Sequence, residues 1–167
     1  YPDNIPYTNY TLITPYDKGC TCLLKASCPH SGGWSIGLIQ WHEVRAFDCL
    51  FAIAKADSNW ESLWKDKSLS LFKDLQTAVK KDSSGTLRNK YQSSFHPTSG
   101  TALYSYIQAM LGSDKGKVTQ RELASENTST AINKLIDDEK ITNPAIIIFL
   151  ADMMNQYGDA GIPTTIK

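Results

Sequence analysis

The residues best suited to chemistry are concentrated in one stretch, residues 31–45. It reads Ser-Gly-Gly-Trp-Ser-Ile-Gly-Leu-Ile-Gln-Trp-His-Glu-Val-Arg, so two indoles, an amide, an imidazole, a carboxylate and a guanidinium follow a pair of glycines. A carboxylate such as that of Glu43 can act as a general acid or base when its surroundings adjust its pKa. No other segment of the sequence holds so many different chemical groups, and we therefore expect the functional site to include this stretch.

The chain contains four cysteines, all within its first third: Cys20, Cys22, Cys28 and Cys49. Cys20 and Cys22 are too close in sequence to pair without strain, so each is expected to pair with Cys28 or Cys49. Zinc ligation with His30 or His42 is the alternative, but the spacing fits no common zinc pattern. A nucleophile formed by Cys20, Cys22 or Cys28 with His30 or His42 is a further alternative, which disulfides would remove. Because disulfides form in oxidising compartments, we predict a secreted protein. We expect no metal ion and no other cofactor.

The composition is that of an ordinary globular domain. Of the 167 residues, 41% are hydrophobic and 20% charged, and the 17 Lys+Arg residues balance the 17 Asp+Glu residues. The lack of a basic excess argues against a nucleic-acid partner. No apolar run in the sequence reaches the about 20 residues needed to span a bilayer, so we expect no integral membrane segment. Because the sequence starts at Tyr1 rather than Met, we expect a mature or trimmed chain.

The spacing of apolar residues predicts a mainly α-helical chain. Residues 1–15 are rich in proline and tyrosine and are predicted to form an extended arm, with residues 16–167 forming a single domain. Residues 17–33 are predicted to be a loop stapled by cysteines, and residues 34–40 a short strand or buried turn. Helices are expected at about 43–55, from 60, at 68–81, 86–92, 101–111, 119–124, 127–136 and 145–157. A loop is predicted at 112–117, followed by a capping box of Thr119 and Glu122.

Two runs of residues carry a resemblance to a known group of enzymes. Ser35-Ile36-Gly37-Leu38-Ile39-Gln40-Trp41-His42, followed by Arg45-Ala46, resembles a segment of phage and bacterial cell-wall lytic enzymes of lysozyme-like fold, which often read Ser-Ile-Gly-x-x-Gln-Trp-His-x-x-Arg-Ala. The Gly-Leu-x-Gln core is also similar to that of goose-type lysozymes and lytic transglycosylases. Ile141-Thr142-Asn143-Pro144, with Asp152-x-x-Asn155-Gln156-Tyr157-Gly158, resembles a later segment of the same group.

The resemblance implies a lysozyme-like domain with a groove for a β-1,4-linked amino-sugar polymer such as peptidoglycan. The Gly-Leu-x-Gln segment would line the floor of the groove, where glycine lets a sugar ring approach the backbone. Gln40 would hydrogen-bond to sugar hydroxyl or acetamido groups, a tryptophan would stack on a sugar ring, and Arg45 would bind a carboxylate. The substrate-binding residues expected on this basis are Trp34, Ser35, Gln40, Trp41, His42, Arg45, Gln156 and Tyr157.

The chain departs from this group at the catalytic acid. The group carries a catalytic Glu before the Gly-Leu-x-Gln segment, whereas this chain has no Glu before Glu43. Asp17 is the acid nearest to the expected position, and Glu43 replaces a residue that is usually small. We expect Asp17 and Glu43 to be the catalytic carboxylates, the general acid having a pKa raised by burial. Simpler roles stay open, namely a turn for Asp17 and a favourable helix-dipole position for Glu43.

Two functions from different classes are consistent with the sequence. The first is a secreted, muramidase-type glycoside hydrolase that cleaves peptidoglycan. The second, suggested by the missing Glu, is a catalytically inactive lysozyme-like domain that binds a glycan or a protein as a toxin, effector or structural module. A cysteine-dependent wall peptidase is a third hypothesis, which requires a free thiolate.

Overall fold

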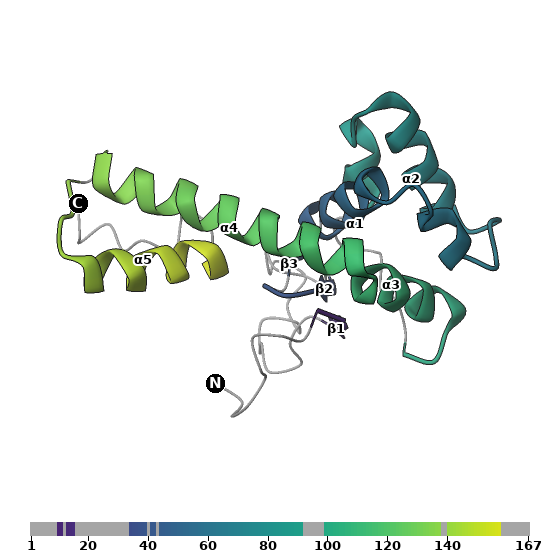
Figure 1. Ribbon diagram of the computed structural model, residues 1–167, viewed down its shortest axis with the longest axis horizontal. Coiled ribbons are helices and arrows are strands. Elements are labelled where there is room, and N and C mark those ends of the chain that lie inside the picture. The colour runs from purple at the N-terminus through teal and green to yellow at the C-terminus, as the bar shows by residue number, and fades with distance from the viewer. Residues whose placement is uncertain are drawn as a thin grey trace, which may run out of the picture. The chain divides into compact units, whose positions relative to one another are not determined.

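The computed structural model of the chain describes residues 10–11, 13–15, 34–39, 41–42, 44–91, 99–137 and 140–157 (Figure 1). Over these residues the chain is mainly helical, as the sequence predicts. It forms two compact units, Tyr1–Arg121 and Glu122–Lys167, whose boundary falls inside helix α4 (Asp114–Asp137). The first unit contains the Gly-Leu-x-Gln segment and the elements that hold it.

A small antiparallel sheet lies in the first unit. Its strands are β1 (Ile13–Pro15), β2 (Trp34–Ile36) and β3 (Trp41–His42), in that spatial order. Ile13 pairs with Ile36, which in turn pairs with Trp41, and all three side chains are buried. Cross-strand pairs of β-branched and aromatic residues stabilise such short strands. The predicted β element at 34–40 is therefore larger than expected, because part of the arm at 1–15 supplies its first strand.

Helix α1 (Val44–Ala56) is central to the core of the first unit. Its buried side chains recur at the three- and four-residue spacing of one helical face: Ala46, Phe47, Cys49, Leu50, Ile53 and Ala54. Helices α2 (Ser70–Lys81) and α3 (Ala102–Gly112) pack against it. They contribute the buried residues Leu71, Phe72, Leu75, Ala78, Ile107, Met110 and Leu111.

An aromatic cluster joins the short 3-10 helix η2 (Trp60–Leu63) to α2 and α3. Trp60 and Trp64 both contact the ring of Phe72, with centroids 5.1 and 5.7 Å away, and Trp64 also contacts Tyr106. The indole N–H of Trp64 donates to the sulfur of Met110 at 3.2 Å, which satisfies a buried donor. Trp60 and Trp64 are buried in the core, whereas Tyr106 is half-buried.

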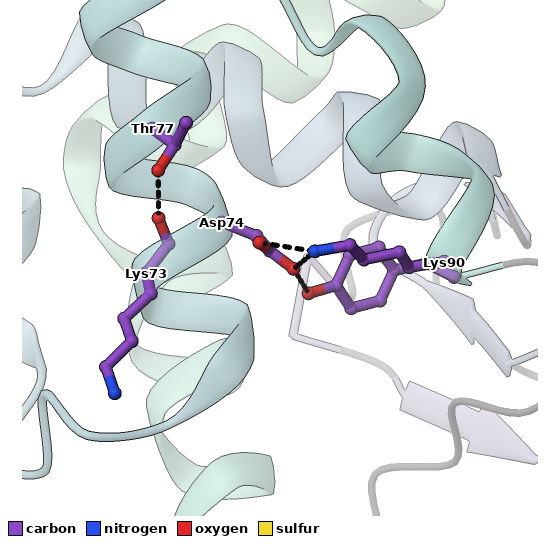
Figure 2. Close-up of polar contacts among 5 residues, drawn as sticks. Lys73, Asp74, Thr77 and Lys90 are labelled. Carbon is purple, nitrogen blue, oxygen red and sulfur yellow. Dashed lines mark hydrogen bonds and ion pairs between the residues drawn. The ribbon is translucent and has the colours of Figure 1, made fainter.

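A second 3-10 helix, η3 (Gly85–Tyr91), packs on α1 and α2. The ring of Tyr91 stacks on Phe47, with centroids 4.7 Å apart and planes inclined by 12°. Lys90 Nζ donates to both carboxylate oxygens of Asp74 on α2, at 2.9 and 3.1 Å (Figure 2). The Tyr91 hydroxyl donates to the same carboxylate. Charge-assisted hydrogen bonds of this kind fix the orientation of η3 against α2.

Helices α3 and α4 meet at a tight corner where the sequence predicts a loop over 112–117. Only Ser113 separates the two helices. Its hydroxyl accepts a hydrogen bond from the backbone N–H of Gly116 at 2.9 Å, and its hydroxyl also donates to the carbonyl of Met110 at 2.9 Å. This bonding satisfies groups that a helix end leaves unpaired. The predicted capping box is wrong, because Thr119 is buried inside α4 rather than placed at its start.

The second unit contains the remainder of α4 and helix α5 (Pro144–Tyr157), which lie side by side (Figure 1). Leu135, Ile147 and Leu150 form its buried cluster. We predicted separate helices at 119–124 and 127–136, but α4 runs through both without a break. In the part of α5 whose side chains are described, residues 144–150, Ile148 and Phe149 are 68% and 62% exposed. Among the described residues, no helix is long and apolar enough to cross a membrane.

Candidate functional site

Gly37, Leu38 and Ile39 of the Gly-Leu-x-Gln segment form a turn directly after β2. Ile36, the last residue of β2, pairs with Trp41 of β3, so this turn belongs to a short hairpin. Gly37 has a φ of +75°, a conformation that glycine adopts without steric cost. A Cβ atom added at Gly37 would lie 2.4 Å from Gln120 Oε1 and 3.1 Å from Cζ3 of Trp41. Glycine is therefore required here for internal packing, in addition to the backbone conformation.

The side chain of Gln120, on α4, is hydrogen-bonded to this turn. This side chain is completely buried, and its Oε1 accepts a hydrogen bond of 2.9 Å from the backbone N–H of Leu38. Its Nε2 donates to the carbonyl of Leu111 at 2.8 Å. Both bonds have the length of good amide hydrogen bonds. One side chain thus ties the turn to the end of α3, which is far from it in the sequence.

The structure describes the side chains of three predicted substrate-binding residues. Trp41 is only 5% exposed and packs on Gly37, so its indole belongs to the core of the hairpin. Ser35 lies half-buried in β2, and Arg45 is exposed in the first turn of α1. Ser35 pairs with His42 across the sheet, which places Ser35 and Trp41 on neighbouring strands.

The other predicted binding residues are described less fully. The backbones of Trp34 and His42 lie in β2 and β3. The backbones of Gln156 and Tyr157 form the end of α5, which belongs to the second unit. Gln40 lies outside the described residues, as do the two predicted catalytic acids, Asp17 and Glu43. Their expected roles stay predictions.

The described strand ends that precede the two acids lie at the same end of the sheet. Pro15 pairs with Trp34, and His42 pairs with Ser35, the next residue of β2. In the sequence, Asp17 is two residues after Pro15, and Glu43 directly follows His42. The turn that contains Gly37 leaves β2 at the opposite end, two residue steps or roughly 7 Å from Trp34. The last residues of β1 and β3 thus lie at the end of β2 that is opposite to the turn.

The predicted disulfide at Cys49 is not confirmed. Cys49 is a free thiol, completely enclosed in the core by α1 and its neighbours. Burial, followed by the charge of the adjacent Asp48, raises the pKa of this thiol. A buried thiol of this kind is unreactive, so Cys49 does not suit a nucleophilic role. Cys20, Cys22 and Cys28 lie outside the described residues.

Two residues of the predicted arm contact the corner between α3 and α4. The guanidinium carbon of Arg121 lies 5.8 Å from the ring centroid of Tyr10, and Arg121 Nη1 donates to the Tyr10 hydroxyl at 3.2 Å. Gln108 Nε2 donates to the carbonyl of Thr11 at 3.4 Å. Arg121 and Gln120 are consecutive, so the same turn of α4 holds both the arm and the Gly37 turn.

Sequence reasoning misses Gln120. The predicted loop at 112–117 and the predicted helix start at 119 put this residue in the first turn of a short helix. In the continuous helix it falls on the same face as Gly116 and Leu123, four and three residues away, which are buried and half-buried. A polar residue on an apolar helical face is the signal that identifies it, and it becomes visible only once α4 is known to begin at Asp114.

Within the described parts of the chain, no group of three or more His, Cys, Asp or Glu side chains is arranged to hold a metal ion. Comparisons of the chain with models of known protein families, with curated proteins and with solved structures find no match in any of the three.

Proposed function

We propose that the chain is a lysozyme-like domain directed to peptidoglycan, and that it hydrolyses the β-1,4 bonds of the glycan strands. The resemblance of the Ser35–Ala46 and Ile141–Gly158 runs motivates this function. The observation that supports it best is the Gly37 turn, which is held by a fully buried side chain rather than left as a loose loop. A rigid turn presents its backbone to a ligand without the entropy cost of ordering a loop.

The proposed site extends along the small sheet. Leu38 and Ile39 are half-exposed at the turn, and Ser35 is half-buried in the middle strand. The last residues of β1 and β3 lie beside the start of β2, at the end of the sheet opposite to the turn. We propose that a polymeric substrate lies along β2, between the turn and this end of the sheet. Trp41 supports the turn in this arrangement, and it is not proposed to stack on a sugar.

The proposed mechanism needs one carboxylic acid that protonates the glycosidic oxygen and one carboxylate that acts as nucleophile or base. We assign these two roles to Asp17 and Glu43. A proton-donating carboxyl near neutral pH requires a pKa raised by burial or by a neighbouring negative charge. The distance between the two carboxyl groups would determine whether the anomeric configuration is retained or inverted.

The test is hydrolysis of purified peptidoglycan by the parent chain and by Asp17→Asn and Glu43→Gln. The rate at which turbidity is lost and the rate at which reducing ends are released should each be about 10²-fold or more lower in each variant, as expected when a general acid or base is removed. Asp137→Asn and Glu126→Gln are matched controls, because both residues are exposed on α4. Hydrolysis at the parent rate by both acid variants would contradict the assignment of these acids.

The same experiment separates the catalytic function from the non-catalytic alternative. That alternative is motivated by the absence of Glu before Glu43. If the parent chain sediments with peptidoglycan but releases no reducing ends, the chain is a binding domain. If it neither binds nor cleaves peptidoglycan, the proposed function is wrong.

A further inference from the structure

Gln120 forms hydrogen bonds with two backbone groups that have no partner within a helix or a strand pair. The N–H of Leu38 lies in a hairpin turn, outside the ladder between β2 and β3. The carbonyl of Leu111 lies in the last turn of α3, where helix carbonyls have no partner further along the helix. Buried backbone groups of this kind are nearly always paired in folded proteins. The amide of Gln120 pairs both.

The amide of Gln120 is well suited to pair one backbone N–H and one backbone carbonyl. A primary amide offers a carbonyl oxygen that accepts and an NH₂ group that donates, and the two groups point in different directions. An apolar side chain of similar size would fill the space but leave both backbone groups unpaired. A glutamate would keep the acceptor toward Leu38 but would lose the donor toward Leu111 when ionised. The fully buried position of Gln120 makes either loss costly, because water cannot replace the missing partner.

The same amide also excludes a side chain at position 37. Gln120 Oε1 occupies the space where a side chain at position 37 would begin. Gly37 and Gln120 are therefore sterically complementary, and the ring of Trp41 also lies close to the same position. The turn is held by this packing and by a hydrogen bond to the residue directly after Gly37.

We propose that Gln120 is the positioning residue of the substrate-binding turn, acting through the Leu38 N–H to hold Gly37–Ile39 in the conformation that binds peptidoglycan. This inference rests on the proposed function of the turn. Gln120 itself is buried and does not touch substrate. A turn released from Gln120 would sample several conformations, and substrate binding would then have to select one of them, which lowers the apparent affinity.

The test compares Gln120→Glu with the parent chain at two pH values. A buried glutamate is held protonated above its ordinary pKa of about 4.3. At about pH 5 the protonated acid can accept from Leu38 and donate to Leu111, as the amide does, whereas the ionised form at about pH 7.5 cannot donate. Binding to sedimented, purified peptidoglycan is measured for both chains at each pH, and the ratio of their dissociation constants is the readout. We expect the variant to bind roughly tenfold more weakly at about pH 7.5, and about as well as the parent at about pH 5.

Two further variants separate positioning from general destabilisation. Gln120→Met removes both hydrogen bonds at every pH, so its loss of affinity should be the same at the two pH values. Gln76→Glu makes the same chemical change to a partly buried amide of α2, which donates to Glu61 at 3.2 Å. It should leave peptidoglycan affinity unchanged at both pH values. Far-UV circular dichroism establishes that each variant is helical under the conditions of the binding measurement.

Hydrogen exchange of the Leu38 amide provides a readout that does not depend on a ligand. In the parent this amide should exchange slowly, and in Gln120→Met its exchange rate should rise by roughly tenfold or more. The exchange rates of amides in α2 should change much less. Parent-like affinity of folded Gln120→Glu and Gln120→Met at about pH 7.5 would overturn the inference while leaving the proposed function standing. If the parent itself does not bind peptidoglycan, the proposed function fails, and the inference fails with it even if Leu38 exchange behaves as expected.

Discussion

The hydroxyl of Tyr91 donates a hydrogen bond of 2.7 Å to Oδ2 of Asp74. The same carboxylate receives Lys90 Nζ, so two consecutive residues of η3 hold one acid of α2 (Figure 2). The Tyr91 ring is meanwhile stacked on Phe47 of α1. One aromatic side chain thus connects α1, α2 and η3 by packing at its face and by a hydrogen bond at its tip.

Tyr91→Phe should lower the free energy of unfolding by about 1–2 kcal/mol, because it removes a hydrogen bond to a charged acceptor but keeps the stacked ring. Burial, and then the hydrogen bond to Asp74, raises the pKa of Tyr91 above its ordinary value of about 10. The folded state therefore keeps a proton that the unfolded chain releases, and this stabilisation is lost as the pH rises above about 10. The difference between the parent and Tyr91→Phe should accordingly shrink at alkaline pH.

Urea unfolding at about pH 7 and at about pH 11 measures this difference. Tyr104→Phe is the matched control, since Tyr104 is half-buried on α3 and shows no hydroxyl hydrogen bond among the described residues. It should change the free energy of unfolding by less than about 0.5 kcal/mol. A Tyr91→Phe effect that is equally small would show that the hydrogen bond to Asp74 contributes nothing.

Gly37→Ala should be strongly destabilising, and Gly100→Ala should be mildly so. Both glycines have positive φ, of +75° and +84°, and an L-residue there costs about 1–2 kcal/mol. At Gly100 an added Cβ would meet no atom within 4 Å, whereas at Gly37 it would clash with Gln120 and Trp41. The clash should add about 1–3 kcal/mol at Gly37 alone. Equal losses in the two variants, measured by urea unfolding, would mean that Gln120 and Trp41 shift aside without cost.

Gly116→Ala tests the corner between α3 and α4. Alanine in a helix interior is normally favoured over glycine by about 1 kcal/mol. Here an added Cβ would lie 2.0 Å from the carbonyl oxygen of Met110, a backbone atom that cannot rotate away. We expect a net loss of about 2 kcal/mol or more in thermal unfolding. Gly112→Ala should change stability by less than about 1 kcal/mol, because its nearest atom is the methyl group of Thr11.

Cys49 should be protected from thiol reagents in the folded chain. Its thiol is buried and its pKa is raised, so little thiolate is present and reagents cannot reach it. Peptide mapping after alkylation at about pH 8 should find Cys49 unmodified in the native chain and modified in denaturing urea. Because the raised pKa keeps the thiol protonated only in the folded state, stability should also fall as the pH rises above about 8.5. Rapid native alkylation of Cys49 would contradict its placement in the core.

The periodicity of apolar residues predicts the helices around Phe47, Leu75, Ile107 and Leu150, because their buried positions recur at helical spacing. The same reasoning fails at α4. Ser113 and Gly116 belong to residue types that favour turns, yet the Ser113 hydroxyl caps the helix and Gly116 permits close contact with α3. Tertiary contacts thus override the local preference of these residues, and no local pattern reveals such contacts.

The candidate site shows the same limit. The Gly-Leu-x-Gln run is recognisable in the sequence, and the structure places Gly37 and Leu38 in a defined turn. The partner of that turn, Gln120, lies 82 residues from Leu38, and its role depends on where a distant helix begins. The reason for glycine at position 37 also differs from the predicted one, because the space above its Cα is filled by Gln120 and Trp41 instead of being open to a sugar.

The start of the chain is connected to the rest of the first unit in two ways. One connection is the covalent chain between Pro15 and Trp34, and the other is the antiparallel pairing of Ile13–Pro15 with Trp34–Ile36. The contacts of Tyr10 with Arg121 and of Thr11 with Gln108 add to the second connection. A single peptide-bond cut between Pro15 and Trp34 would therefore leave the N-terminal fragment bound as a separate chain. In that nicked protein, release of the fragment would report directly on the strength of the strand pairing beside the Gly37 turn.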